Sequence, residues 1–140
     1  MGIRGKILAV TAVLGVLAAT GAQAEDAKGE AKLAKALEGR TVRAGIPCID
    51  VRKIISTEIF NGTAIVYRLR GSPTLYVNRP TAGAEGLNGN NTLGIEQAVQ
   101  LCEGMNLMTG DNGGRGGGSA YNGGIQLGEF VPWAKDEAAK

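Results

Sequence analysis

The hydrophobic pattern between residues 41 and 79 is that of short antiparallel strands. β-Branched and aromatic residues dominate this stretch, and turn residues interrupt it at short intervals, which is typical of a strand meander. The pair Asn61-Gly62 favours a tight hairpin, because both central residues of a type I′ turn need a positive φ. The predicted strands are residues 48–55, 57–60, 63–69 and 74–77.

The strand at residues 63–69 has a period of two. One face would carry Ile65, Tyr67 and Leu69, and the other would carry mostly Val66, Arg68 and Arg70. Such alternation predicts a sheet with one buried face and one wetter face.

Two segments outside the meander have helical features. Residues 25–38 are rich in Ala, Lys and Glu, which predicts a short helix or a frayed linker closed by Gly39. Its expected core contacts are Leu33, Ala34 and Leu37. Residues 92–108 fit both a helix and a strand, and we expect one or two helical turns leading into a strand around Cys102.

The C-terminal part of the chain is rich in glycine. Residues 109–124 contain eight glycines and match neither a Walker A motif nor a dinucleotide or calcium repeat, which predicts a mobile loop. Residues 125–133 form a last predicted strand, followed by a charged tail at 134–140. Trp133 is either a ligand-stacking platform or a cover for the open end of the core.

The first 24 residues have the parts of a secretory signal. Arg4 and Lys6 precede the uncharged apolar run 7–19, and Ala22-Gln23-Ala24 provides a small-x-small cleavage site between Ala24 and Glu25. We therefore expect a periplasmic or secreted protein with no stable membrane span after cleavage. A retained N-terminal anchor is the alternative.

The composition removes several chemistries. The chain has no histidine, so Ser-His-Asp sites and His-containing zinc sites are excluded. Without Arg4 and Lys6, the 15 Lys and Arg fall to 13 and equal the 13 Asp and Glu, which argues against a nucleic-acid partner. We expect no metal, no cofactor and no catalytic residue.

The two cysteines of an exported chain allow one disulfide, between Cys48 and Cys102. On the chain-entropy model, closing a loop of about 55 residues stabilises the fold by about 4 kcal/mol at most. A redox role is disfavoured because the Cys-x-x-Cys spacing is missing.

Charge is unevenly distributed along the chain. Residues 40–79 contain seven Lys and Arg against two acids, a local charge of +5. This predicts either a basic face for an anionic ligand or partner, or long side chains that cover the outside of a small sheet and protect its edge. The candidate binding surface is Arg52, Arg68, Tyr76, Asn78 and Arg79.

Several short motifs in this order resemble a family of small exported bacterial proteins classed as a domain of unknown function. They are Cys48-Ile49, the hairpin, Leu75-Tyr76-Val77-Asn78, Gly86-Leu87, Leu101-Cys102 and Leu127-Gly128-Glu129-Phe130-Val131-Pro132. The family pattern has four cysteines, and Ala84 and Ile125 stand at the other two places. This resemblance implies that a second disulfide has been lost and that Cys48 and Cys102 form the remaining pair. It implies no catalytic residue.

The sequence therefore predicts a signal peptide (1–24), a helical or flexible segment (25–40), one β-rich domain (41–133) and a charged tail (134–140). The domain would be a small antiparallel sheet or barrel of about five to seven short strands. We expect a non-enzymatic binding or envelope-associated structural module with an envelope or extracellular partner. The alternatives are a small envelope hydrolase with paired carboxylates such as Asp50 and Glu58, and an inhibitor or adaptor that presents the Gly-rich loop.

Overall fold

The structure is a computed structural model that describes residues 22–89, 91–94, 98–111 and 121–135. Three predicted features lie largely outside these ranges: the signal peptide, the middle of the Gly-rich segment and the charged tail. Helix α1 (Ala22–Ala36) begins inside the predicted signal. Cleavage after Ala24 would remove three residues of this helix and keep Leu33 and Leu37.

The described chain is mainly β, as predicted, with one α-helix and ten short strands. After α1 come β1 (Arg40–Val42), β2 (Cys48–Asp50), the 3-10 helix η1 (Val51–Lys53), β3 (Ile54–Phe60), β4 (Ala64–Leu69), β5 (Leu75–Asn78), the 3-10 helix η2 (Ala84–Gly86), β6 (Asn91–Leu93), β7 (Gln100–Cys102), β8 (Asn106–Asp111), β9 (Tyr121–Gln126) and β10 (Phe130–Lys135). The number of strands exceeds the prediction because four of them have three residues each. Strands this short leave almost no periodic pattern in a sequence.

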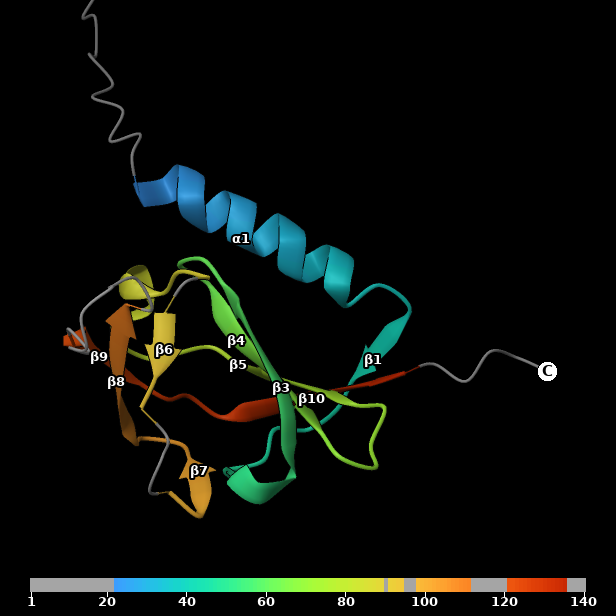
Figure 1. Cartoon of the computed structure of the whole chain (residues 1–140). Helices are drawn as coiled ribbons and strands as arrows, with labels where there is room; N and C mark the ends of the chain where they lie inside the picture. Colours follow the sequence, from blue (N-terminus) through green and yellow to red (C-terminus); the bar gives the residue numbers. More distant parts are fainter. Residues whose placement is uncertain (1–21, 90, 95–97, 112–120, 136–140) are drawn as a thin grey trace, which may run out of the picture.

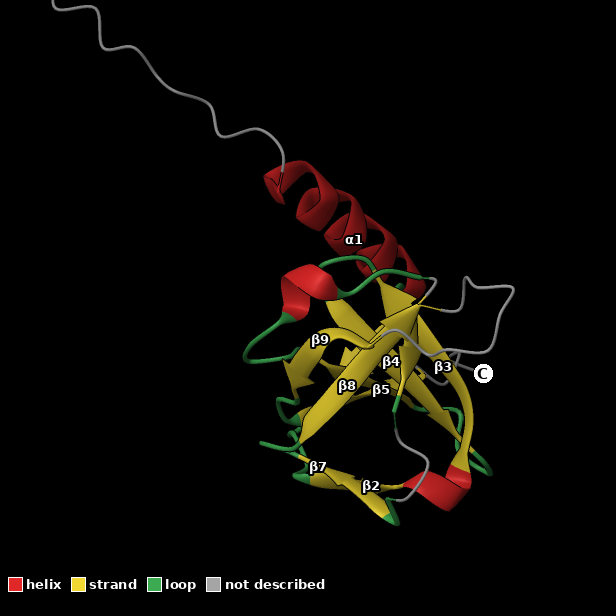
Figure 2. Ribbon diagram, turned by 60° about the vertical axis from the view of Figure 1, so that its left-hand side comes forward, coloured by secondary structure: helices red, strands yellow, loops and turns green. Residues whose placement is uncertain are grey.

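The strands form three antiparallel sheets (Figures 1 and 2). The main sheet has the order β1-β10-β5-β4-β3, and it contains the predicted meander β3-β4-β5. The second sheet pairs β2 with β7, and the third has the order β6-β8-β9. Bridges from Ile46 to Phe130 and from Ala82 to Gln126 connect neighbouring segments, and the Leu127 amide donates to the Met105 carbonyl at 2.8 Å.

The predicted disulfide is present. Cys48 and Cys102 are bonded and face each other across the β2–β7 pair. The bond therefore joins two three-residue strands that are far apart in the sequence, and no cysteine is free.

Several local predictions were wrong. The last strand predicted at residues 125–133 is divided between the end of β9 and the beginning of β10, because residues 127–129 belong to neither strand. Residues 48–55 do not form one strand, because the Asp50 carboxylate accepts from the Arg52 amide at 2.9 Å and caps η1. In the β3–β4 hairpin only Gly62 has a positive φ, of 64°, and the Thr63 amide donates to the Phe60 carbonyl at 3.0 Å. The Gly-rich segment is partly strand, because residues of β8 and β9 such as Thr109 and Gly123 pair across the hairpin.

Two hydrophobic clusters lie on opposite faces of the main sheet. The inner cluster, enclosed by the three sheets, consists of Ile49, Ile65, Tyr67, Leu69, Leu87, Leu101, Leu107, Ile125, Leu127 and Phe130. The outer cluster, beneath α1, consists of Leu33, Leu37, Phe60, Ala64, Val66, Leu75 and Val77. The face predicted to be exposed to solvent is therefore buried at Val66, because α1 packs over this residue.

Helix α1 contributes fewer core residues than predicted but comes very close to the sheet. Leu33 and Leu37 are buried as expected, whereas Ala34 is exposed. At Gly29, a Cβ atom would collide with the Thr63 side chain and the Asn61 carbonyl. A residue without a side chain therefore lets the helix contact the β3–β4 turn.

Candidate functional site

Two predicted surface residues, Arg52 and Arg68, are exposed. The Arg52 guanidinium donates to the Asp50 carboxylate at 3.1 and 2.8 Å. These hydrogen bonds lower the pKa of the Asp50 carboxyl and raise the pKa of Arg52. Arg68 lies on β4 opposite Ser56 and forms no ion pair with another described residue.

Asn78, predicted as an exposed residue, is fully buried. Its side-chain amide donates to the Gly128 carbonyl at 2.7 Å, and its side-chain oxygen accepts from the Gly128 amide at 3.0 Å. A Cβ atom at Gly128 would collide with the Arg79 carbonyl. The prediction failed because the partner of Asn78 is 50 residues away, which no local pattern reveals.

The remaining two candidates, Tyr76 and Arg79, differ in their exposure to solvent. Tyr76 is half-buried against the inner cluster. Arg79 is exposed and donates to Glu30 of α1 at 2.5 and 3.2 Å. Arg68 pairs with Leu75 at the start of β5, so the strand rise places Arg68 and Arg79 on the order of 13 Å apart. The five residues do not form one continuous surface.

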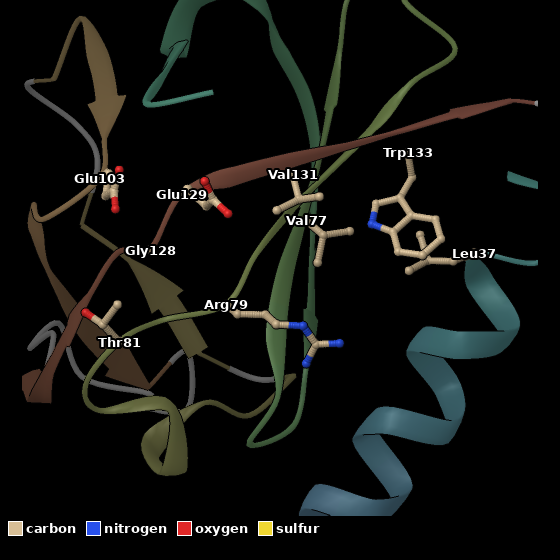
Figure 3. A pocket seen from close by; sticks show the side chains of 9 residues that line it. All are labelled: Leu37, Val77, Arg79, Thr81, Glu103, Gly128, Glu129, Val131 and Trp133. Atoms are coloured by element: carbon tan, nitrogen blue, oxygen red, sulfur yellow. The ribbon is translucent and has the colours of Figure 1, made fainter. Parts of the chain in front are cut away.

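A groove of about 390 Å³ lies beside α1 on the outer face of the main sheet. We call it the β5–β10 groove. Its lining residues are Leu37, Val77, Arg79, Thr81, Glu103, Gly128, Glu129, Val131 and Trp133. Figure 3 shows that Leu37, Val77, Val131 and Trp133 gather on one side, while Glu103, Glu129 and Thr81 lie on the other.

Strand β10 and the residue before it contribute three lining residues of this groove through simple alternation. Glu129 directly precedes the strand, and Val131 and Trp133 follow at every second position. Side chains at this spacing share one face of a strand. Val131 and Trp133 pair with Val77 and Leu75 of β5, so the apolar half of the groove continues the outer cluster.

The charges in the β5–β10 groove are not balanced. Arg79 is neutralised by Glu30, whereas Glu103 and Glu129 have no ion-pair partner among the described residues. The exposed Glu129 carboxylate lies over Gly45, where a Cβ atom would collide with it. The groove thus combines an aromatic and aliphatic half with an acidic half.

The sequence analysis singled out two residues that line this groove, Arg79 and Trp133, and missed others. Trp133 packs against the outer cluster, as its predicted role as a core cover requires, and it also lines the groove. Glu129 and Val131 were missed, although the alternation Glu129, Val131, Trp133 is visible in the sequence. Glu103 comes from the β7–β8 turn and carries no local signal.

Tyr67 is a second polar group of interest, in the inner cluster. Its ring is fully buried and packs against Phe130 with centroids 5.8 Å apart. Its hydroxyl has no hydrogen-bond partner in the described part of the chain. Burial raises the pKa of this hydroxyl well above its ordinary value.

The carboxylates considered for hydrolysis, Asp50 and Glu58, have different surroundings. Both Asp50 oxygens accept hydrogen bonds from Arg52, and the lowered pKa keeps this carboxylate ionised, which does not suit a general acid. Glu58 is exposed on β3, beside Lys28 and Lys32 of α1.

No known protein family, curated protein or solved structure matches this chain. The described residues include no group of three or more metal-ligating side chains. Within the same ranges, no helix has the length and apolar character needed to cross a membrane.

Proposed function

We propose that this protein is a non-enzymatic binding module of the periplasm or the extracellular space, and that the β5–β10 groove holds its ligand. The observation that carries the proposal is the half-buried Trp133 beside Leu37, Val77 and Val131 in a groove of about 390 Å³. Pockets that bind small molecules combine an apolar lining with a few polar groups. The disulfide supports an oxidising compartment.

The charges of the groove indicate the kind of ligand. The carboxylates of Glu103 and Glu129, which have no ion-pair partner in the described part of the chain, favour a positive charge. The indole ring of Trp133 favours an apolar group or a cation above its face. A small organic cation with an apolar body therefore fits best, with its ammonium near Glu103 and Glu129 and its chain along Val131.

Trp133 is the single tryptophan of the chain, so its fluorescence reports on this groove. We would titrate the protein with n-hexylamine, n-hexanol and hexanoate, which share a six-carbon chain and differ in charge. A ligand of this size binds with a Kd on the order of 1 mM in a favourable site. We expect hexylamine to shift the emission at lower concentration than hexanol, and hexanoate to have the weakest effect.

Two charge variants test the assignment. Glu129→Gln and Glu103→Gln should each weaken hexylamine binding several-fold and leave hexanol binding unchanged, whereas the exposed Glu38→Gln, outside the groove, is the matched control. Equal binding of hexylamine and hexanoate would contradict the cationic class. No binding by any of the three would contradict the groove itself.

A further inference from the structure

The main sheet ends at a long strand whose outer edge is open. Among the residues that the structure describes, strand β3 pairs only with β4, whereas the opposite edge strand β1 has three residues. From Ser56 to Phe60 the β3–β4 register is regular, and the one irregularity lies between Ile54 and Ser56. Every second residue of this segment therefore directs its backbone N–H and C=O groups away from the sheet.

This edge has few of the features that protect natural edge strands. Bulges, prolines and lysines are the usual protection, and here the irregularity at Ile55 protects just the beginning of β3. Residues 56–60 are Ser, Thr, Glu, Ile and Phe. One negative charge, on Glu58, is the sole charge in this segment.

Helix α1 and β3 together form a second cavity of about 380 Å³ beside this edge. Its lining residues are Lys28, Gly29, Lys32, Glu58, Ile59, Phe60 and Asn61. A groove between a helix and an open edge strand is the shape that accepts an extended peptide, with backbone hydrogen bonds for affinity and side chains for specificity. The close contact at Gly29 sets the position of the helix wall.

The positive charge of this cavity favours a peptide with acidic side chains. Lys28 and Lys32 are one turn apart on the same side of α1, and neither has an ion-pair partner among the described residues. They outnumber Glu58 in the lining. Carboxylates on an incoming strand would compensate these two ammonium groups.

We propose that the open edge of β3, residues 56–60, accepts an extended acidic peptide as an additional strand, with Lys28 and Lys32 facing its carboxylates. This site is separate from the β5–β10 groove, because the two cavities share no residue. The proposal therefore does not depend on the proposed function.

The test uses two soluble peptides with the same β-propensity and opposite charge, acetyl-Val-Glu-Val-Thr-Val-Glu-Val-amide and acetyl-Val-Lys-Val-Thr-Val-Lys-Val-amide. Amide chemical shifts and hydrogen exchange are measured by NMR on the oxidised protein. We expect the acidic peptide to bind and to protect alternate amides of β3 at least tenfold against exchange. The basic peptide should bind at least tenfold more weakly at low salt.

The double variant Lys28→Glu with Lys32→Glu should weaken the acidic peptide about tenfold at low salt. Lys35→Glu is the matched control, because Lys35 is exposed on the same helix and does not line the cavity. Amide spectra of both variants without peptide verify the fold.

Three outcomes would overturn the proposal. Binding of the acidic peptide without new protection in β3 would place it elsewhere. Equal binding of both peptides would show that Lys28 and Lys32 do not select an acidic peptide. Protection of β3 that rises with protein concentration in the absence of peptide would show that a second copy of the chain occupies this edge.

Discussion

The two faces of the main sheet are covered in different ways. The inner face is enclosed by the other two sheets, and the inner cluster contains ten buried residues. The outer face is covered by the single helix α1, and the outer cluster contains seven. Five strands at about 4.8 Å spacing span about 19 Å, whereas a helix with its side chains is about 10–12 Å wide.

One helix is therefore too narrow for this sheet, and parts of the outer face remain uncovered. The β5–β10 groove lies beside the helix over two inner strands of the sheet, and the second cavity lies beside the edge strand β3. The comparison predicts that the enclosed inner face contributes more to the stability than the outer face, and both candidate binding sites lie where coverage of the sheet is incomplete.

The sharpest test of this comparison pairs two leucines of equal burial. Leu101 in the inner cluster and Leu33 in the outer cluster are 0% and 1% exposed. Large-to-small substitutions of this kind cost about 2–5 kcal/mol, depending on how far the site collapses. We expect Leu101→Ala to cost about 4–5 kcal/mol and Leu33→Ala about 2–3 kcal/mol, since a helix on an open face shifts more easily than an enclosed sheet. Urea unfolding measures both, and equal losses would break the comparison.

Removal of the disulfide tests how much the β2–β7 sheet, which covers part of the inner cluster, contributes to stability. The double variant Cys48→Ser with Cys102→Ser avoids a lone thiol and releases a long loop, since the cysteines are 54 residues apart in sequence. We expect a loss of about 2–4 kcal/mol, measured by thermal and urea unfolding. Reduction of the unchanged protein is the control and should give a similar loss. An unchanged midpoint after reduction would contradict this role.

Asn78→Ala tests the polar link between β5 and the segment that connects β9 to β10. The substitution leaves both the N–H and the C=O of Gly128 without the partners that they have now. A buried unsatisfied group costs about 1–3 kcal/mol, so we expect a loss of about 2 kcal/mol in the free energy of unfolding. Asn106→Ala, at an exposed position of β8, should change it little. Similar values for the two variants would show that the Gly128 contacts contribute nothing net.

Tyr67 makes the stability of the inner face depend on alkaline pH. Its folded-state pKa is raised above the unfolded value of about 10, so its contribution is fully present below that pH. As the pH rises further, the unfolded chain loses the proton and the folded protein keeps it. The free energy of unfolding should therefore fall by up to about 1.4 kcal/mol per pH unit.

Tyr67→Phe isolates this contribution. We expect the variant to lose stability less steeply above pH 10, and to equal the unchanged protein or exceed it by up to about 1 kcal/mol at neutral pH, because the hydroxyl has no described partner. Parallel slopes for the two proteins between pH 9 and 11 would contradict a buried, neutral Tyr67.

The smallest effect is expected from the ion pair between α1 and β5. Arg79 and Glu30 are 55% and 52% exposed, and exposed pairs contribute about 0–1 kcal/mol. Glu30→Gln should lower stability within this range, and the difference should disappear at high salt. The same variant should strengthen the effect of hexanoate on Trp133 fluorescence, because Arg79 loses its carboxylate. No change with hexanoate would show that Arg79 does not reach the ligand.

Much of the architecture could be predicted from the sequence. Local patterns were sufficient for the β-rich class, for the meander that became β3, β4 and β5, and for Leu33 and Leu37 as contacts of the helix. The disulfide followed from a count of two cysteines in a chain whose first 24 residues predict a secretory signal. Each of these depends on residue type or on a period of neighbouring residues, which a sequence displays directly.

The candidate site was decided by tertiary structure. The sequence grouped Asn78 with exposed residues, but Gly128 buries it, and Val66 is dry because a helix from the beginning of the chain covers it. The β5–β10 groove joins residues of α1, β5, β10 and the β7–β8 turn. Coverage of a sheet face depends on the width and position of distant elements. The sequence by itself therefore determined the longer strands of the meander, and only the assembly of the elements decided which side chains remain open to a ligand.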